Sequence, residues 1–351
     1  MNILRVFMMF LLCASFVPPV SALAQSEDLT PSTSPTPLTL INGWFNAPYD
    51  TSNAEVEKVN DIVHLKGAIA TSGNDPEPFV LPEGFRPSKY VYIPVDLCDS
   101  TYGQLDIEPS GEVLIQAETS LTDAECFTSL DGASFALNGS GFTALKPING
   151  WTNTLFDVAN AGVANIAGIV HFRGGISTKE TNAEAFVLPK GFRPAHAVYV
   201  PVDLCAATKG RLYIQPNGVV TVQAESSFGY AQCYTSLDGA WFVATDTGFK
   251  SLSLMNGWTD GPFDTSSAKV EKANGIVYFQ GAIATSGSNT EPFVLPSSFI
   301  PHTNVYVPVD LCGATNGRLF IQPNGVVIVQ AETTFGDAQC FTSLDGVSFA
   351  P

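Results

Sequence analysis

The chain has 351 residues, of which 16 are lysine or arginine and 33 are aspartate or glutamate, so its formal net charge is −17. This acidic balance argues against nucleic acid and anionic membrane surfaces as partners, because both are bound through basic patches. The acidity by itself identifies no partner and is typical of a soluble surface.

The N-terminus has the pattern of an export signal. Residues 1–24 carry Arg5 as their one charge, continue with an apolar run over 6–16, and close with Ala22-Leu23-Ala24 at the positions that a signal peptidase reads. No later stretch is long and apolar enough to span a membrane. We therefore expect a secreted protein, extracellular or periplasmic, in which the Ser-, Thr- and Pro-rich residues 25–37 form a linker.

The rest of the chain repeats three times without insertions. Equivalent landmarks lie 107 residues apart: Trp44, Trp151 and Trp258; Pro82, Pro189 and Pro296; Gly111, Gly218 and Gly325; Asp131, Asp238 and Asp345. We predict three tandem domains over 38–144, 145–251 and 252–351, each long enough to build its own core. The domains either close into a pseudo-trimer within one monomer or lie like beads on a string.

Within each unit the signals are those of β-strands. Residues 269–272 and 276–281 flank Asn274-Gly275, a strong two-residue hairpin turn. In the central hairpin of the second unit, a three-residue loop at Pro216-Asn217-Gly218 places Leu212 opposite Val222, which separates apolar from polar side chains. No useful helix-period segment is present. We therefore predict an all-β fold of antiparallel, jelly-roll-like β-sandwiches with about eight strands in each unit.

Six of the seven cysteines form pairs 28 positions apart: Cys98 and Cys126, Cys205 and Cys233, Cys312 and Cys340. The seventh, Cys13, lies in the export signal. An even number of cysteines in an exported chain indicates disulfides, and the threefold pattern favours one bridge inside each unit among the possible connectivities.

One further motif carries a resemblance. The sequence Leu188-Pro189-Lys190-Gly191-Phe192-Arg193-Pro194, the strand 198–202 and the hairpin 210–222 resemble the β-sandwich head domains of phage tail-fibre and receptor-binding proteins. That resemblance implies a domain that trimerises and recognises a surface receptor. The chain departs from the pattern in its export signal, its cysteine pairs, its three copies and Ile300, which stands where the motif has arginine. These departures favour a secreted cellular protein that uses the same module.

Candidate chemistry is sparse, and we predict a protein that is not an enzyme. His64 and His171 are equivalent, but the third unit has Tyr278 there, so no recurrent catalytic set exists. We place both histidines on the outer face of their strand. Three carboxylates recur in every unit and could hold calcium, but no calcium-loop motif accompanies them, and roles in the Leu-Asp-Gly turn and at strand ends explain them better: Asp96, Glu118 and Asp131; Asp203, Glu225 and Asp238; Asp310, Glu332 and Asp345. No cofactor is expected otherwise.

Recognition is the most plausible function. The recurrent Trp44, Trp151 and Trp258 are expected in the core. Trp241, unique to the second unit, and Phe228 and Tyr230, in the segment 226–230, are the candidates for contact with a ligand. We expect a glycan or a cell-surface receptor as the partner. The alternatives are a structural extracellular or envelope component, and a carbohydrate hydrolase, which would need a recurrent carboxylate pair in an aromatic cleft.

Overall fold

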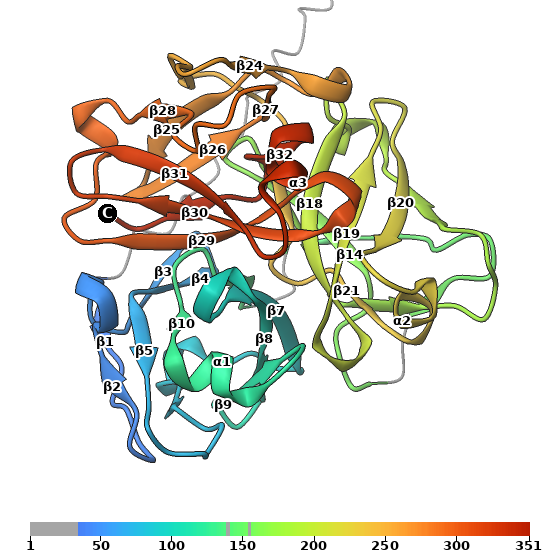
Figure 1. The fold of residues 1–351 in the computed structure, drawn as a ribbon. Helices are drawn as coiled ribbons and strands as arrows, with labels where there is room; N and C mark the ends of the chain where they lie inside the picture. Colours follow the sequence, from blue (N-terminus) through green and yellow to red (C-terminus); the bar gives the residue numbers. More distant parts are fainter. Residues whose placement is uncertain (1–33, 138–140, 154–155) are drawn as a thin grey trace, which may run out of the picture.

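The computed structural model describes residues 34–137, 141–153 and 156–351. The chain is mostly β-structure with antiparallel sheets, and residues of the three repeats form three adjacent bodies, coloured blue to teal, green to yellow and orange to red in Figure 1. Among these residues no helix is long and apolar enough to cross a membrane. The predicted export signal and most of the predicted linker lie outside the described residues.

Each repeat contributes one four-stranded sheet with the same strand order. The sheets are β1 (Thr36–Pro37), β3 (Glu55–Val59), β4 (Ile62–Lys66) and β11 (Ser134–Ala136); β12 (Thr143–Ala144), β14 (Gly162–Ile166), β15 (Ile169–Arg173) and β22 (Trp241–Val243); β23 (Lys250–Ser251), β25 (Lys269–Ala273), β26 (Ile276–Gln280) and β33 (Ser348–Phe349). The first strand of each sheet begins two residues before the unit boundary expected from the sequence.

The remaining strands form a second layer built around the central hairpin. In the first repeat they are β6 (Phe79–Val80), β9 (Glu112–Ala117), β8 (Tyr102–Ile107) and β7 (Val91–Asp96), with β10 (Thr128–Ser129), β5 (Ala68–Ala70) and β2 (Phe45–Asn46). In the third they are β28 (Phe293–Val294), β31 (Val326–Ala331), β30 (Asn316–Ile321) and β29 (Val305–Asp310), with β24 (Trp258–Asp260), β27 (Ala282–Thr285) and β32 (Thr342–Ser343).

In the second repeat the same strands join into one seven-stranded sheet. Its order is β13 (Thr152–Asn153), β16 (Gly175–Ser177), β21 (Thr235–Ser236), β18 (Val198–Leu204), β19 (Thr208–Ile214), β20 (Val219–Ala224) and β17 (Glu184–Val187). Single bridges, Leu97 to Thr128 and Leu311 to Thr342, make the corresponding connection in the other two repeats. The fold is therefore β-sandwich-like, as the alternation of the sequence predicts.

The predicted hairpin registers are confirmed. Leu212 pairs with Val222 and Ile214 with Val220, and Gly218 closes the three-residue loop with φ of +92°. In the first repeat Leu105 pairs with Ile115 in the same way. The polar and apolar faces are separated because strand side chains alternate, so a slip of one residue would bury the wrong set.

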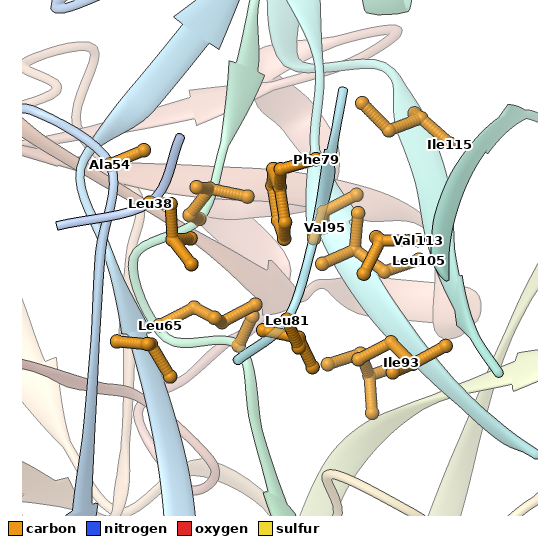
Figure 2. Close-up of a cluster of buried hydrophobic side chains, with 14 of the residues drawn as sticks. Leu38, Ala54, Leu65, Phe79, Leu81, Ile93, Val95, Leu105, Val113 and Ile115 are labelled. Atoms are coloured by element: carbon orange, nitrogen blue, oxygen red, sulfur yellow. The ribbon is translucent and has the colours of Figure 1, made fainter. Parts of the chain in front are cut away.

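Each repeat encloses its own hydrophobic cluster, made of side chains from both layers. Figure 2 shows part of the first, with Leu38, Leu65, Phe79, Leu81 and Ile93 among its buried members. The second and third clusters draw only on residues of their own repeats. The tryptophans expected in the core lie there, since Trp44, Trp151 and Trp258 are 6%, 3% and 4% exposed.

The structure adds helices that the sequence pattern did not predict. The three are α1 (Leu121–Cys126), α2 (Phe228–Cys233) and α3 (Phe335–Cys340). Each starts after a hydroxyl side chain that accepts a backbone N–H: Ser120 from Thr122, Ser227 from Gly229 and Thr334 from Gly336. Six residues are less than two helical turns, too few for a hydrophobic period to be visible in the sequence.

Each short helix ends at a disulfide. The bridges join Cys98 to Cys126, Cys205 to Cys233 and Cys312 to Cys340, which confirms the expected pairing within each repeat. Disulfides of this kind are typical of proteins in oxidising compartments. The 3-10 turns that carry the first cysteine are Cys98–Ser100, Cys205–Ala207 and Cys312–Ala314; the others are Pro48–Asp50, Glu83–Phe85, Lys190–Phe192, Pro262–Asp264 and Ser297–Phe299.

Candidate functional site

The repeats contact one another through equivalent residues. Strands β7, β18 and β29 lie against each other pairwise. A serine hydroxyl of one repeat donates to a tyrosine carbonyl oxygen of another, each time over 2.6 Å: Ser129 to Tyr306, Ser236 to Tyr92 and Ser343 to Tyr199. We call these contacts the 3–1, 1–2 and 2–3 interfaces, after the repeats they join.

A glycine with positive φ lies at each of these close approaches. Gly132 has φ of +85°, and a Cβ atom there would lie 2.6 Å from Val307 of the third repeat. Gly239 would meet Ile93 at 2.9 Å, whereas Gly346 would meet Val200 at 3.4 Å. Because a side chain is strained at positive φ and has no space at the first two positions, the Leu-Asp-Gly turn fixes how closely the repeats approach.

A row of aromatic rings crosses each interface. At the 3–1 interface Tyr49 lies edge-on to Phe127 with centroids 5.7 Å apart, Phe127 is 5.1 Å from Tyr306, and Tyr306 stacks on Phe320 at 4.5 Å. At the 2–3 interface the row is Phe263, Phe341, Tyr199 and Tyr213, with distances of 5.8, 5.0 and 4.7 Å. At the 1–2 interface it is Phe156, Tyr234 and Tyr92, with distances of 5.5 and 5.4 Å.

The outermost ring of each row is exposed to solvent. Tyr49, Phe156 and Phe263 occupy equivalent positions and are 59%, 52% and 59% exposed. Contact of such a ring with a partner would remove a large apolar area from water. The rows are therefore the strongest candidate for a binding surface in the part of the chain that the structure describes.

Two interfaces combine their aromatic row with an arginine and a buried aspartate. Arg318 Nη1 lies 2.9 Å from Asp96 Oδ2, and its guanidinium carbon is 4.8 Å from the centre of the Tyr306 ring. Arg211 Nη1 lies 2.8 Å from Asp310 Oδ2 and sits over Tyr199 at the same distance. The arrangement unites an ion pair with a cation–π contact across the boundary between repeats.

The 1–2 interface has a different set of side chains at the equivalent positions. Gln104 replaces the arginine, and with its amide nitrogen turned to the carboxyl it donates to Asp203 Oδ1 over 2.7 Å. Tyr102 donates its hydroxyl to the same oxygen over 3.4 Å. Asp106 stands where the other repeats have the stacking rings Tyr213 and Phe320. Asp203 thus faces two neutral partners at this interface, where its equivalents Asp96 and Asp310 face arginine.

Pockets open beside two of the rows. One of about 130 Å³ at the 3–1 interface is lined by Tyr49, Phe127, Tyr306 and Arg318, together with Cys98 and Asp99. Another of about 200 Å³ at the 1–2 interface is lined by Tyr92, Gln104, Asp106, Phe156, Asp203 and Tyr234, among others. Both combine aromatic walls with a few polar groups, as binding sites for small ligands commonly do.

Carboxyl groups near the interfaces have raised pKa values. Burial raises the pKa of Asp96 to about 7, although Arg318 acts in the opposite direction, and burial raises the pKa of Asp106 to about 6. Burial and the neighbouring Glu225 raise the pKa of Glu118 to about 7. Burial likewise raises the pKa of Asp203 well above its ordinary value. The charged forms are disfavoured because desolvation and like charges both penalise them.

The histidines lie on the face predicted, turned away from the core of their own repeat, but that face is not open to solvent. His64 and His171 are 5% and 6% exposed. Burial lowers the pKa of His64 to about 4 and of His171 to about 3, so both are neutral near pH 7. A hydrophobic cluster shared by the three repeats lies in this region and includes Val59, Trp241 and Tyr278.

The structure buries one ligand candidate chosen from the sequence, Trp241, and leaves the other two, Phe228 and Tyr230, at least partly accessible. Trp241 is 1% exposed and packs edge-on against Tyr278 of the third repeat, with centroids 5.2 Å apart. Phe228 belongs to helix α2 rather than to a loop and packs against Trp151 at 6.2 Å. Tyr230 remains accessible, at 38% exposed. Trp241, which has no equivalent aromatic residue in the other repeats, thus packs between repeats in the cluster that also contains Val59 and Tyr278.

The recurrent aspartates have separate structural partners. Asp131, Asp238 and Asp345 each accept a glycine N–H, from Gly67, Gly174 and Gly281, at 3.1, 2.9 and 3.1 Å. Asp96 and Asp310 instead face arginine. Within the described ranges no group of three or more His, Cys, Asp or Glu side chains is arranged to hold a metal ion.

The aromatic rows were not predicted from the sequence, although a signal for them exists. Aromatic residues recur at 49, 156 and 263, at 92, 199 and 306, and at 127, 234 and 341. Nothing in that recurrence reveals that, in each row, the first and third sets come from one repeat and the second from its neighbour.

Comparison of the chain with protein-family models, with curated proteins and with solved structures finds no match.

Proposed function

We propose that this chain is a secreted, non-enzymatic recognition protein that binds a glycan on a cell surface. In this proposal its three repeats are tandem jelly-roll-like β-sandwich domains that close into a pseudo-trimer within one monomer. The observation that carries it is the exposed aromatic ring at the edge of every interface, at 49, 156 and 263. Sugar rings present apolar C–H faces that stack on such side chains, and nearby polar groups orient their hydroxyls.

Other features support the proposal. Equivalent contacts join each repeat to both others, as a closed arrangement requires. The motif around Leu188 to Pro194 resembles receptor-binding heads that trimerise, and the disulfides fit an oxidising compartment outside the cytoplasm. Three similar surfaces on one molecule would also give avidity for a repeated ligand.

Binding is favoured over hydrolysis because the one pair of carboxyl groups that lines an aromatic pocket in the described part of the chain does not recur. Asp106 and Asp203 both line the aromatic pocket of the 1–2 interface. The positions equivalent to Asp106 are Tyr213 and Phe320, so no such pair recurs at the other interfaces. Tyr49, Phe156 and Phe263 each pack edge-on against one interface ring and leave the rest of their surface exposed, which a binding role would use.

A glycan array tests the proposal. The exported chain should bind a defined set of glycans, and replacing Tyr49, Phe156 and Phe263 together by alanine should reduce binding at least about tenfold, the loss expected for removing stacking contacts. The matched control replaces Val80, Val187 and Val294 by alanine, since these equivalent side chains are 41%, 42% and 45% exposed and lie outside the rows. Absence of glycan binding by the unmodified chain would favour the structural alternative.

A further inference from the structure

The 2–3 and 3–1 interfaces each contain a cation supplied by the chain itself. The guanidinium groups of Arg211 and Arg318 lie between the face of a tyrosine of their own repeat and a buried aspartate of the next. At the 2–3 interface Lys209 Nζ adds a second cation, 2.8 Å from Asp310 Oδ1. In both places an aromatic face and a carboxylate together bind a positive charge, which is a favourable combination once water is excluded.

The 1–2 interface retains the same receiving groups without the cation. Tyr92 is equivalent to Tyr199 and Tyr306, and Asp203 is equivalent to Asp310 and Asp96. The equivalent of the arginine is Gln104, which is shorter and neutral. The ring that stacks on tyrosine at the other two interfaces is replaced by Asp106, which is smaller and acidic. Both changes coincide with the pocket of about 200 Å³.

The charges around this pocket are of one sign. The charged groups that act on Asp203 are Glu118 and Asp106, and the one that acts on Asp106 is Glu108. Asp106 Oδ1 has no hydrogen-bond partner although it is shielded from solvent. The nearby Lys89 is paired with Asp157, at 2.5 Å. The pocket therefore offers negative potential and aromatic walls, with no ion-pair partner for Asp106 or Asp203 among the described residues.

We propose that the 1–2 pocket binds an organic cation, an alkylammonium or guanidinium group, in the position that arginine occupies at the other two interfaces. The cation lies over the face of Tyr92 and is neutralised by Asp106 and Asp203, while Phe156 and Tyr234 form the outer wall. A free amine and the side chain of a peptide lysine or arginine share this chemistry. The inference goes beyond glycan recognition and does not depend on it.

Isothermal titration of the exported chain tests the inference, with arginine amide as the cationic probe and citrulline amide as its neutral isostere. We expect saturable binding of arginine amide and at least about tenfold weaker binding of citrulline amide, because a desolvated cation–π contact with a carboxylate is worth about that factor. Equal binding of the two probes, or no binding of arginine amide, would overturn the proposal.

Two variants locate the binding. Gln104→Arg supplies the missing cation within the chain and should abolish binding of arginine amide. Asp106→Asn should weaken the binding of arginine amide by about tenfold. This second variant keeps the test decisive if Gln104→Arg does not fold. Glu83→Gln is the matched control, because Glu83 is an exposed carboxylate on another turn. Unchanged affinity in both pocket variants would contradict the proposal.

Two further measurements distinguish a peptide from a free amine as the source of the cation, and cation binding from glycan binding. Tighter binding of an arginine-containing tetrapeptide than of arginine amide would identify a polypeptide as the source, and equal binding would identify a free amine. Gln104→Arg changes only the 1–2 pocket and leaves Tyr49 and Phe263 at the other two interfaces in their present surroundings, so glycan binding at those two interfaces should persist in that variant. Failure of cation binding is thereby distinguished from failure of glycan recognition.

Discussion

The 1–2 and 2–3 interfaces are built on equivalent strands, yet their buried polar groups differ in charge. At the 2–3 interface Asp310 faces Lys209 and Arg211, whereas at the 1–2 interface Asp203 faces Tyr102 and Gln104. The serine–tyrosine hydrogen bond and the aromatic contact are common to both. The shared serine–tyrosine hydrogen bonds and aromatic contacts thus define the association of these repeats, and a few other side chains decide the charge of each interface.

The largest expected effect comes from removing the aspartate of each interface in turn. Asp310→Asn leaves two buried cations without a counter-charge and should lower the free energy of unfolding by about 3–5 kcal/mol. Asp203→Asn breaks no ion pair, because among the described residues Asp203 faces only Tyr102 and Gln104, and should cost less than about 1 kcal/mol. Urea unfolding of both variants measures the difference. Similar losses in the two variants would show that the interfaces do not differ in charge.

The glycine turns give a second, smaller comparison. Gly132→Ala and Gly346→Ala both place a side chain at positive φ, which costs about 1 kcal/mol. Gly132→Ala also brings Cβ within 2.6 Å of Val307, whereas Gly346→Ala leaves 3.4 Å to Val200. We therefore expect Gly132→Ala to cost about 1–3 kcal/mol more, from overpacking. Thermal unfolding would refute this if Gly346→Ala proved the more damaging.

The third prediction concerns how the free energy of unfolding depends on pH, through the titration of Asp106 and Glu118. The pKa of Asp106 is about 6 and that of Glu118 about 7 in the folded chain, both above the ordinary values of free carboxyl groups near 4. The folded state binds these protons more tightly than the unfolded state, so proton binding stabilises the fold. This contribution to the free energy of unfolding is complete below about pH 4 and is lost as the pH rises through 6 to 7.

Unfolding in urea at intervals from pH 4 to pH 8 measures this loss of stability. Asp106→Asn should reduce the slope, because it removes one of the titrating groups from the 1–2 interface. Glu83→Gln, an exposed carboxylate elsewhere, should leave the slope unchanged. A slope that both variants share with the unmodified chain would indicate that the titrating carboxyl groups lie elsewhere.

Local patterns predicted much of the fold. The alternation of apolar residues around Pro216-Asn217-Gly218 was sufficient to predict the pairing of Leu212 with Val222. Equal spacing of the cysteines predicted their pairing. The helices after Ser120, Ser227 and Thr334 were missed because a single turn and a half shows no period. Trp241 was misplaced because its environment consists of residues from another repeat, which no local pattern reveals.

The sequence by itself determined the repeats, the strand registers, the disulfide pairs and the all-β class, because these depend on periodicity, turn chemistry and spacing within one repeat. Only the tertiary structure decided which residues meet between repeats. It brought Tyr49 near Tyr306 and Tyr92 near Asp203, and it buried His64 and Trp241. The physical reason is that these contacts join side chains far apart in the chain. A local sequence pattern gives the type of each residue but not which distant residue it will contact.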